Sequence, residues 1–156
     1  MKSINSVLFV CLGNICRSPL AEGVFRHVVD NAGKSGTIRI ESAGTGGWHI
    51  GNLPDERSIA IAQLHGIDIS NQRAQQVTLN DFLEFDLILA MDRDNLSNLE
   101  AMCPKGSHAI IALYRDYCLA EHKDVPDPYY GGTGGFEEAY QLASRCSNAL
   151  MDKLAG

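Results

Sequence analysis

The chain has 156 residues, of which 45% are hydrophobic, and this is enough for a single domain over residues 1–156 with a core of its own. The net charge of −6 argues against a nucleic-acid or anionic-membrane partner, because such binding needs a broad basic surface. The five cysteines follow no paired spacing, so we expect neither a disulfide framework nor a zinc site. No apolar run is long enough to span a membrane and no signal peptide is recognisable, so we expect a cytoplasmic protein.

The first predicted unit is a strand, a loop and a helix. Residues 7–10 form an apolar run typical of a buried strand, and residues 18–32 carry apolar side chains at helical spacing. In such a unit the N–H groups of the loop and of the first helical turn converge and favour a phosphate-sized anion. Cys11 begins the loop, where the same field favours the nucleophilic thiolate, and Arg17 ends it with donors suited to phosphate. The alternative is that Cys11 is a small buried hydrophobe and Arg17 a solvated helix residue.

A second strand and a second helix follow. Residues 38–42 alternate apolar and polar, which predicts a strand nearer the edge of the sheet, and residues 42–48 form a glycine-rich loop. Trp48, the only tryptophan, either covers a small core or faces a substrate. The helix over residues 54–66 begins with a proline and two acidic residues and ends at a glycine, and we expect His65 near its end to be structural.

The second half of the chain continues the alternation of strands and helices. Thr78 and Asp81 predict a capping box, in which each side chain bonds the backbone of the other at the start of a short helix. The remaining predicted elements are buried strands over residues 87–91 and 109–113, a helix between them that ends by Pro104, a long polar loop over residues 114–135 and a final helix over residues 136–154.

The first, third and fourth strands are continuously apolar, which favours a parallel sheet covered on both faces. We therefore expect a doubly wound α/β fold with a four-stranded parallel sheet and helices on both faces. Ligands of such sheets bind beyond the carboxyl ends of the strands, where the strand order reverses. If the first strand is central, the loop at Cys11 lies at that point, with Ser42 and Asp92 following the second and third strands.

A thiolate that attacks phosphorus needs a proton donor for the leaving oxygen. The preferred donor is Asp127, which lies between Pro126 and Pro128 and is followed by two tyrosines. Asp92 is the rival, but it can be explained as the N-cap of the next helix, and Asp127 itself could be an ordinary turn residue. A slot for an aromatic leaving group would be lined by Trp48, Tyr129 and Tyr130. A deep slot favours phosphotyrosine over the shorter phosphoserine.

These features together resemble the low-molecular-weight protein tyrosine phosphatase family over essentially the whole chain. The resemblance rests on residues 11–19, 42–45, 48, 50–52, 65–67, 91–95 and 127–131. It implies a phosphocysteine mechanism without a metal or other cofactor, in which Cys11 attacks in line, Arg17 and the loop N–H groups bind the phosphate, and Asp127 protonates the tyrosyl oxygen and then activates water. The implied substrate is a phosphotyrosine-containing protein or peptide, with inorganic phosphate or other oxyanions as inhibitors.

The same resemblance assigns further site residues. The phosphate- and substrate-binding set would be Leu12, Gly13, Asn14, Ile15, Cys16, Ser18, Trp48, Tyr129 and Tyr130, supported by Ser42 and Asp92. Ser18 would hydrogen-bond the thiolate, and Asn14 would hold the loop through Ser42. Cys16 would form a reversible disulfide with Cys11 under oxidation, and so regulate the enzyme, unless it is a plain loop thiol.

Two positions bear on how closely the chain follows the family. Many relatives carry a loop-supporting histidine where this chain has Asn71 or Gln72, and an amide can also donate and accept hydrogen bonds. The phosphoarginine-specific branch typically has threonine at the position of Ile15, so Ile15 favours phosphotyrosine.

Two alternative functions remain. An arsenate reductase shares this fold, but it needs further redox cysteines in a segment near residues 80–90, where this sequence has none. A phosphate-binding module without catalysis would not need both Cys11 and Asp127.

Overall fold

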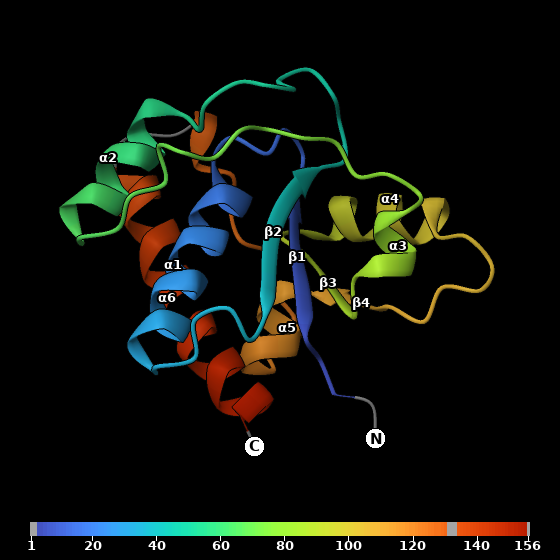
Figure 1. Cartoon of the computed structure of the whole chain (residues 1–156). Helices are drawn as coiled ribbons and strands as arrows, with labels where there is room; N and C mark the ends of the chain where they lie inside the picture. Colours follow the sequence, from blue (N-terminus) through green and yellow to red (C-terminus); the bar gives the residue numbers. More distant parts are fainter. Residues whose placement is uncertain (1–2, 131–133, 156) are drawn as a thin grey trace.

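The computed structural model describes residues 3–130 and 134–155, apart from the side chains of Tyr130 and Ala155. Within this part of the chain, parallel strands form one sheet in the order β2-β1-β3-β4 (Figure 1). The strands are β1 (Ser6–Cys11), β2 (Arg39–Gly44), β3 (Leu87–Ala90) and β4 (Ile110–Leu113). The helices are α1 (Arg17–Asn31), α2 (Glu56–Leu64), α3 (Asp81–Glu84), α4 (Arg93–Met102), α5 (Tyr114–Leu119), the 3-10 helix η1 (Pro128–Tyr130) and α6 (Gly134–Ala155).

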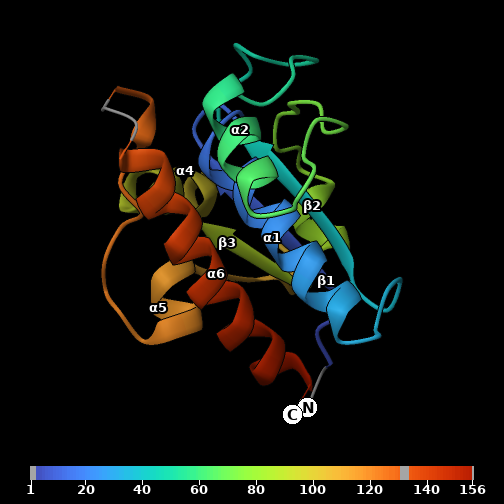
Figure 2. The same ribbon diagram turned by 90° about the vertical axis from the view of Figure 1, so that its left-hand side faces the viewer.

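Helices cover both faces of the sheet. The helices α1, α5 and α6 lie on one face and α3 and α4 on the other, and Figure 2 shows the first group from its own side. Side chains along β1 alternate between the two faces, so that Phe9 belongs to one core and Val10 to the other. The predicted doubly wound α/β fold with four parallel strands is therefore confirmed.

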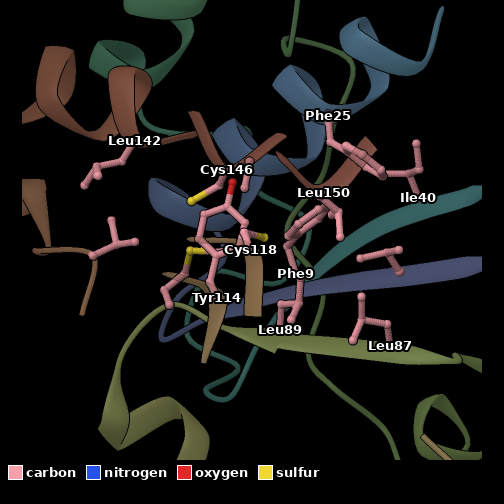
Figure 3. Packing of buried hydrophobic residues seen from close by; sticks show 14 of the residues in the cluster. Phe9, Phe25, Ile40, Leu87, Leu89, Tyr114, Cys118, Leu142, Cys146 and Leu150 are labelled. Atoms are coloured by element: carbon pink, nitrogen blue, oxygen red, sulfur yellow. The ribbon is translucent and has the colours of Figure 1, made fainter. Parts of the chain in front are cut away.

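Phe9 lies at the centre of the larger core (Figure 3). Its ring makes edge contacts with Phe25 of α1, at 5.9 Å between ring centroids, and with Tyr114 of α5, at 5.6 Å. All three side chains are almost completely buried. This packing anchors β1, and Cys11 is the last residue of that strand.

The strand order reverses at β1. Val10 of β1 pairs with Ala90 of β3 on one side and with Ala43 of β2 on the other. The chain leaves β1 at Cys11 and enters α1 at Arg17. The loop between them thus lies at the switch point, where ligands of open parallel sheets bind.

The second strand is longer than predicted. Ser42 pairs with Phe9 inside β2, so the expectation that Ser42 begins a glycine-rich loop is wrong. The pairing continues to Gly44 because β1 itself continues to Cys11 and supplies backbone partners. Ser42 is consequently held by the sheet rather than by a loop.

Two predictions for the segment after residue 109 are also wrong. The strand β4 is not buried throughout, because it is an edge strand in which Ile110 is exposed and only Leu113 is fully covered. The predicted polar loop contains α5, because Tyr114 and Cys118 are four residues apart and both enter the core beside Phe9.

Several local predictions are confirmed. Thr78 and Asp81 form the reciprocal capping box: the backbone N–H of Thr78 donates to the Asp81 carboxylate at 2.9 Å, and that of Asp81 donates to the Thr78 hydroxyl at 3.3 Å. His65 caps the end of α2 and stacks on Tyr140, with ring centroids 3.7 Å apart.

In residues 3–130 and 134–155, no helix combines the length and apolar character needed to cross a membrane.

Candidate active site

The phosphate loop, residues 11–17, wraps around the sulfur of Cys11. The backbone N–H of Asn14 donates to Cys11 Sγ at 3.3 Å, and the hydroxyl of Ser18 lies 2.9 Å from the same sulfur. Asn14 adopts the left-handed conformation with φ of +57°, which asparagine tolerates better than most residues. The sulfur therefore accepts a hydrogen bond from the loop and lies within hydrogen-bond distance of a hydroxyl group in the first turn of α1.

Asn14 holds the loop from behind. Its side-chain amide donates to Ser18 Oγ at 2.8 Å and to Ser42 Oγ at 3.0 Å, and its carbonyl oxygen accepts from the backbone N–H of Gln75 at 2.9 Å. The side chain is buried, and its amide makes three hydrogen bonds to three separate segments. The expected contact between Asn14 and Ser42 is present, and it ties the loop to β2.

Glu22 of α1 was missed by the sequence analysis. Ser42 Oγ donates to Glu22 Oε1 at 2.7 Å, and the Arg26 guanidinium donates to Glu22 Oε2 at 2.7 Å. Burial raises the pKa of Glu22, although the bonds from Ser42 and Arg26 oppose the shift. The i, i+4 pair of Glu22 and Arg26 was the available sequence signal, but it indicates an exposed helix face as readily as a buried one.

Asn71 and Gln72 lie in the stretch where the family resemblance led us to expect a supporting histidine. The Gln72 amide donates to the carbonyl oxygen of Pro19 at 3.0 Å, in the first turn of α1. Asn71 is exposed. Gln72 therefore supports the start of α1. The hydroxyl of Ser42 is held separately, because it donates to the carboxylate of Glu22.

Arg17 is buried and fixed by three groups. Its Nη1 donates to Asp92 Oδ2 at 2.7 Å and to the carbonyl oxygen of Val125 at 2.9 Å, and its Nη2 lies 3.6 Å from Asp127 Oδ2. Burial disfavours the charged form of Arg17 and acts to lower its pKa. The negative charges of Cys11, Asp92 and Asp127 outweigh this effect, so the pKa of Arg17 is raised. The alternative of a solvated Arg17 is therefore wrong.

Asp92 has two contacts at the end of β3. One oxygen accepts from the backbone N–H of Asn95 at 2.8 Å, which is the predicted N-cap of α4, and the other holds Arg17. Asp127 instead stands at the mouth of the site, about one third exposed, with Oδ1 accepting from the N–H of Tyr129 at 3.0 Å. The two carboxylates thus occupy different environments beside the same arginine.

A cavity of about 300 Å³ opens over the loop. Its lining residues are Cys11, Leu12, Gly13, Ile15, Cys16, Arg17, Trp48, His49, Asp127 and Tyr129. The structure therefore brings the predicted nucleophile, arginine, acid and two of the three predicted aromatic residues to one cavity. The predicted residues Asn14, Ser18, Ser42 and Asp92 do not line it and contact the loop or Arg17 from behind.

The aromatic walls are partly exposed. Trp48 is 72% exposed and Tyr129 40% exposed. The Trp48 ring lies against Gly46 so closely that a Cβ at Gly46 would be 1.8 Å from it. The prediction for Tyr130 concerns a side chain outside the described part of the structure, so it stays a prediction.

His49 lines the cavity and was not predicted from the sequence. A Cβ at Gly13 would lie 2.9 Å from His49 Cδ2, so the ring rests on the phosphate loop. A histidine after the only tryptophan in a glycine-rich loop was the available signal. Its contact with Gly13 depends on how two distant loops meet.

Cys16 is buried in the same cavity as Cys11. The pKa of Cys16 is raised to about 12. Burial is the largest cause, and the negative charges of Asp55, Cys11 and Asp127 add to it. Cys16 is therefore a neutral thiol near neutral pH, and in this form it is a poor nucleophile.

Comparison with known proteins agrees with this geometry. A family model described as low molecular weight phosphotyrosine protein phosphatase matches residues 6–156. The low molecular weight phosphotyrosine protein phosphatase of Schizosaccharomyces pombe is 46% identical over 92% of this chain and 94% of that protein.

Solved structures extend the comparison. The crystal structure of YfkJ from Bacillus subtilis superposes with a TM-score of 0.89 at 44% identity, covering 99% of this chain and 96% of that one. The structure of a Drosophila arginine phosphatase has a TM-score of 0.89 at 32% identity, covering 96% of this chain and 98% of that one.

Proposed function

Because the chain belongs to the low-molecular-weight phosphotyrosine protein phosphatase family, whose members are cysteine-dependent phosphoric monoester hydrolases, we propose that it hydrolyses phosphotyrosine through a phosphocysteine intermediate on Cys11. The observation that carries this proposal is a single cavity lined by Cys11, Arg17 and Asp127. Nucleophile, phosphate-binding cation and proton donor are the three groups that the reaction needs.

In the first step the Cys11 thiolate attacks phosphorus in line. A sulfur–phosphorus bond forms while the bond from phosphorus to the tyrosyl oxygen breaks, and Asp127 gives its proton to that leaving oxygen. The contacts of Ser18 Oγ and of the Asn14 N–H with Cys11 Sγ support this role, because both stabilise the thiolate.

Arg17 and the N–H groups of the phosphate loop bind the three non-bridging oxygens as charge develops on them. Asp92 and the carbonyl oxygen of Val125 both hold Arg17 through Nη1. Because these contacts exist before substrate arrives, the guanidinium needs little reorganisation in the transition state.

In the second step Asp127 acts as a base. Its carboxylate takes a proton from water, the water oxygen attacks phosphorus, and the sulfur–phosphorus bond breaks to release phosphate and the Cys11 thiolate. The partial exposure of Asp127 at the cavity mouth supports this role, because water can reach it.

The aromatic and apolar walls favour an aryl phosphate. Trp48 and Tyr129 flank the cavity mouth, and Ile15 presents an apolar side chain from the loop. Ile15 in place of a threonine favours phosphotyrosine over phosphoarginine, although an arginine phosphatase shares the fold.

The test is a substrate panel with the wild-type protein and Cys11→Ser. We expect the wild-type protein to hydrolyse a phosphotyrosine peptide faster than phosphoserine and phosphoarginine peptides of matched sequence, and not to reduce arsenate. Cys11→Ser should lose turnover but still bind inorganic phosphate, measured by calorimetry. Turnover retained by Cys11→Ser would overturn the mechanism, arsenate reduction would favour the reductase, and binding without wild-type turnover would favour a non-catalytic module.

We also propose that Cys16 protects Cys11 from irreversible oxidation. Peroxide oxidises the Cys11 thiolate to a sulfenic acid, and the Cys16 thiol then displaces water from it to form a disulfide. One of the charges that keep Cys16 protonated, that of Cys11, is lost in the sulfenic acid. Cys16→Ser should therefore recover less activity than the wild-type protein when a thiol reductant follows peroxide, and equal recovery would contradict the proposal.

A further inference from the structure

Arg57 lies in the first turn of α2 and contacts two aromatic rings from other parts of the chain. Its guanidinium carbon is 5.3 Å from the centre of the Tyr129 ring and 4.6 Å from the centre of the Phe136 ring. Tyr129 belongs to η1 and lines the active-site cavity, whereas Phe136 belongs to α6 and is buried. Arg57 itself does not line the cavity. The guanidinium therefore joins a wall of the cavity to a fixed residue behind it.

The carboxylate of Asp55 fixes the orientation of Arg57. Nε of Arg57 donates to Asp55 Oδ1 and Nη2 donates to Oδ2, each at 3.0 Å, and the backbone N–H of Arg57 donates to Oδ1 at 2.8 Å. These bonds lower the pKa of Asp55, so the carboxylate is charged near neutral pH. Two N–H groups on one carboxylate set the plane of the guanidinium, and this plane decides where its faces meet the rings.

The start of α2 is also attached to the phosphate loop. The backbone N–H of Asp55 donates to the carbonyl oxygen of Ile15 at 2.7 Å, and the hydroxyl of Ser58 donates to that of Cys16 at 3.4 Å. Arg57 lies between these two contacts in the sequence. Its position is therefore fixed relative to the loop that begins at Cys11.

Tyr129 connects Arg57 with the proposed acid. The ring of Tyr129 lies beside the guanidinium, and its backbone N–H donates to Asp127 Oδ1 at 3.0 Å. Both residues are partly exposed at the cavity mouth, so burial alone does not hold them. Because the ring and the N–H belong to one residue, a contact that holds the ring also limits the movement of the Asp127 carboxylate.

We propose that Arg57 is a positioning residue, which holds Tyr129 and through it keeps the Asp127 carboxylate directed at the leaving oxygen. This inference rests on the proposed function, in which Asp127 is the proton donor. It goes further because it assigns the placement of the acid partly to a side chain that touches neither the substrate nor the reacting atoms. Loss of Arg57 should therefore act on the step that protonates the leaving group.

The experiment measures kcat/KM for a phosphotyrosine peptide and for p-nitrophenyl phosphate, because this ratio reports the first chemical step. We expect Arg57→Ala to lower kcat/KM about 3- to 10-fold on the peptide. The loss on p-nitrophenyl phosphate should be less than about 2-fold, because its leaving group departs without a proton. Arg57 is 41% exposed, so we expect the variant to remain folded.

Arg39→Ala is the matched control. Arg39 is 45% exposed, binds the carboxylate of Glu41 two residues away at 2.6 Å, and lies over the ring of Phe85 at 4.5 Å. It pairs with Ser6, at the end of β1 away from the phosphate loop. Arg39→Ala thus removes the same kinds of contact at a distant place, and it should leave kcat/KM unchanged on both substrates.

A double-mutant cycle tests whether Arg57 acts through Tyr129. Tyr129→Ala removes the ring and keeps the backbone N–H, so adding Arg57→Ala to it should cost little further kcat/KM on the peptide. An equal loss on both substrates, a loss no larger than that of Arg39→Ala, or a full additional loss in the Tyr129→Ala background would overturn the inference. Failure of the proposed function is distinguishable, because the wild-type protein would then hydrolyse neither substrate.

Discussion

At the scale of single residues, two carboxylates beside one arginine have different proposed roles because their surroundings differ. Both oxygens of Asp92 are occupied, one by the N–H of Asn95 and one by Arg17. Asp127 is more exposed and is farther from the guanidinium, at 3.6 Å. We therefore assign the proposed proton exchange with the leaving group and with water to Asp127.

Asp127→Asn should slow hydrolysis of phosphotyrosine about 10²- to 10⁴-fold, because an amide cannot supply the proton. The loss should be much smaller for p-nitrophenyl phosphate, whose leaving group is stable without a proton. Steady-state kcat on both substrates checks this, with Asp124→Asn as a matched control in the same segment. An equal loss on both substrates would point to Asp92 as the acid.

Glu22 provides a prediction for pH. Its pKa is raised by burial in the folded protein, so the folded state holds this proton more tightly than the unfolded chain does. The contribution of Glu22 to stability is therefore fully present below the ordinary carboxyl pKa and is lost as pH rises through the raised value. In Glu22→Gln this dependence is absent.

As pH rises from about 4 to about 8, the free energy of unfolding should shift in favour of Glu22→Gln relative to the wild-type protein, because only the wild-type carboxyl group loses its proton. Chemical denaturation at several pH values measures this difference. Glu100→Gln, an exposed change on α4, is the control. Parallel pH profiles for the wild-type protein and Glu22→Gln would contradict the role of burial.

At the scale of elements, the carboxyl end of β2 supports the phosphate loop. Gly44 pairs with Cys11 across the sheet, and its backbone also bonds Gln75 at 2.8 Å and Val77 at 2.9 Å. The sheet thereby connects the loop to the segment that holds Asn14 through the N–H of Gln75. Position 44 has little room for a side chain.

Gly44→Ala should lower kcat/KM and destabilise the fold by about 1–3 kcal/mol, because the added Cβ overpacks the site. It would lie 2.7 Å from the carbonyl oxygen of Leu12, a backbone atom that moves only with the loop. Gly134→Ala, where a Cβ would meet nothing within 4 Å, is the control. Unchanged kinetics in Gly44→Ala would show that the loop does not depend on this contact.

At the scale of the whole molecule, the strand β1 connects the larger core to the candidate active site. Phe9 packs between α1 and α5, and Cys11, two residues later, faces the same side of the sheet and begins the phosphate loop. The position of Cys11 thus depends on packing that extends through the larger core.

Phe9→Ala should reduce the free energy of unfolding by about 3–5 kcal/mol, because it leaves a cavity between two helices and the sheet. Urea denaturation measures the loss. Leu64→Ala, at an exposed position on α2, should change stability by less than about 0.5 kcal/mol. A loss of that small size in Phe9→Ala would mean that the core around β1 is not as tightly packed as the ring contacts indicate.

Local patterns in the sequence determined much of this protein. The apolar run of β1, the loop from Cys11 to Arg17 and the alternation of strands with helices predicted the parallel sheet and the switch point, because these signals arise from neighbouring residues. The capping box at Thr78 and the N-cap at Asp92 were predictable for the same reason.

Only the tertiary structure decided the contacts between distant segments. Arg17 and Asp92 are 75 residues apart, and Ser42 and Glu22 are 20 apart on different elements. The helix α5 was missed because its burial depends on β1 and α6, which are distant in sequence. Periodicity indicates which face of an element is covered, but the partner that covers it depends on how the elements pack.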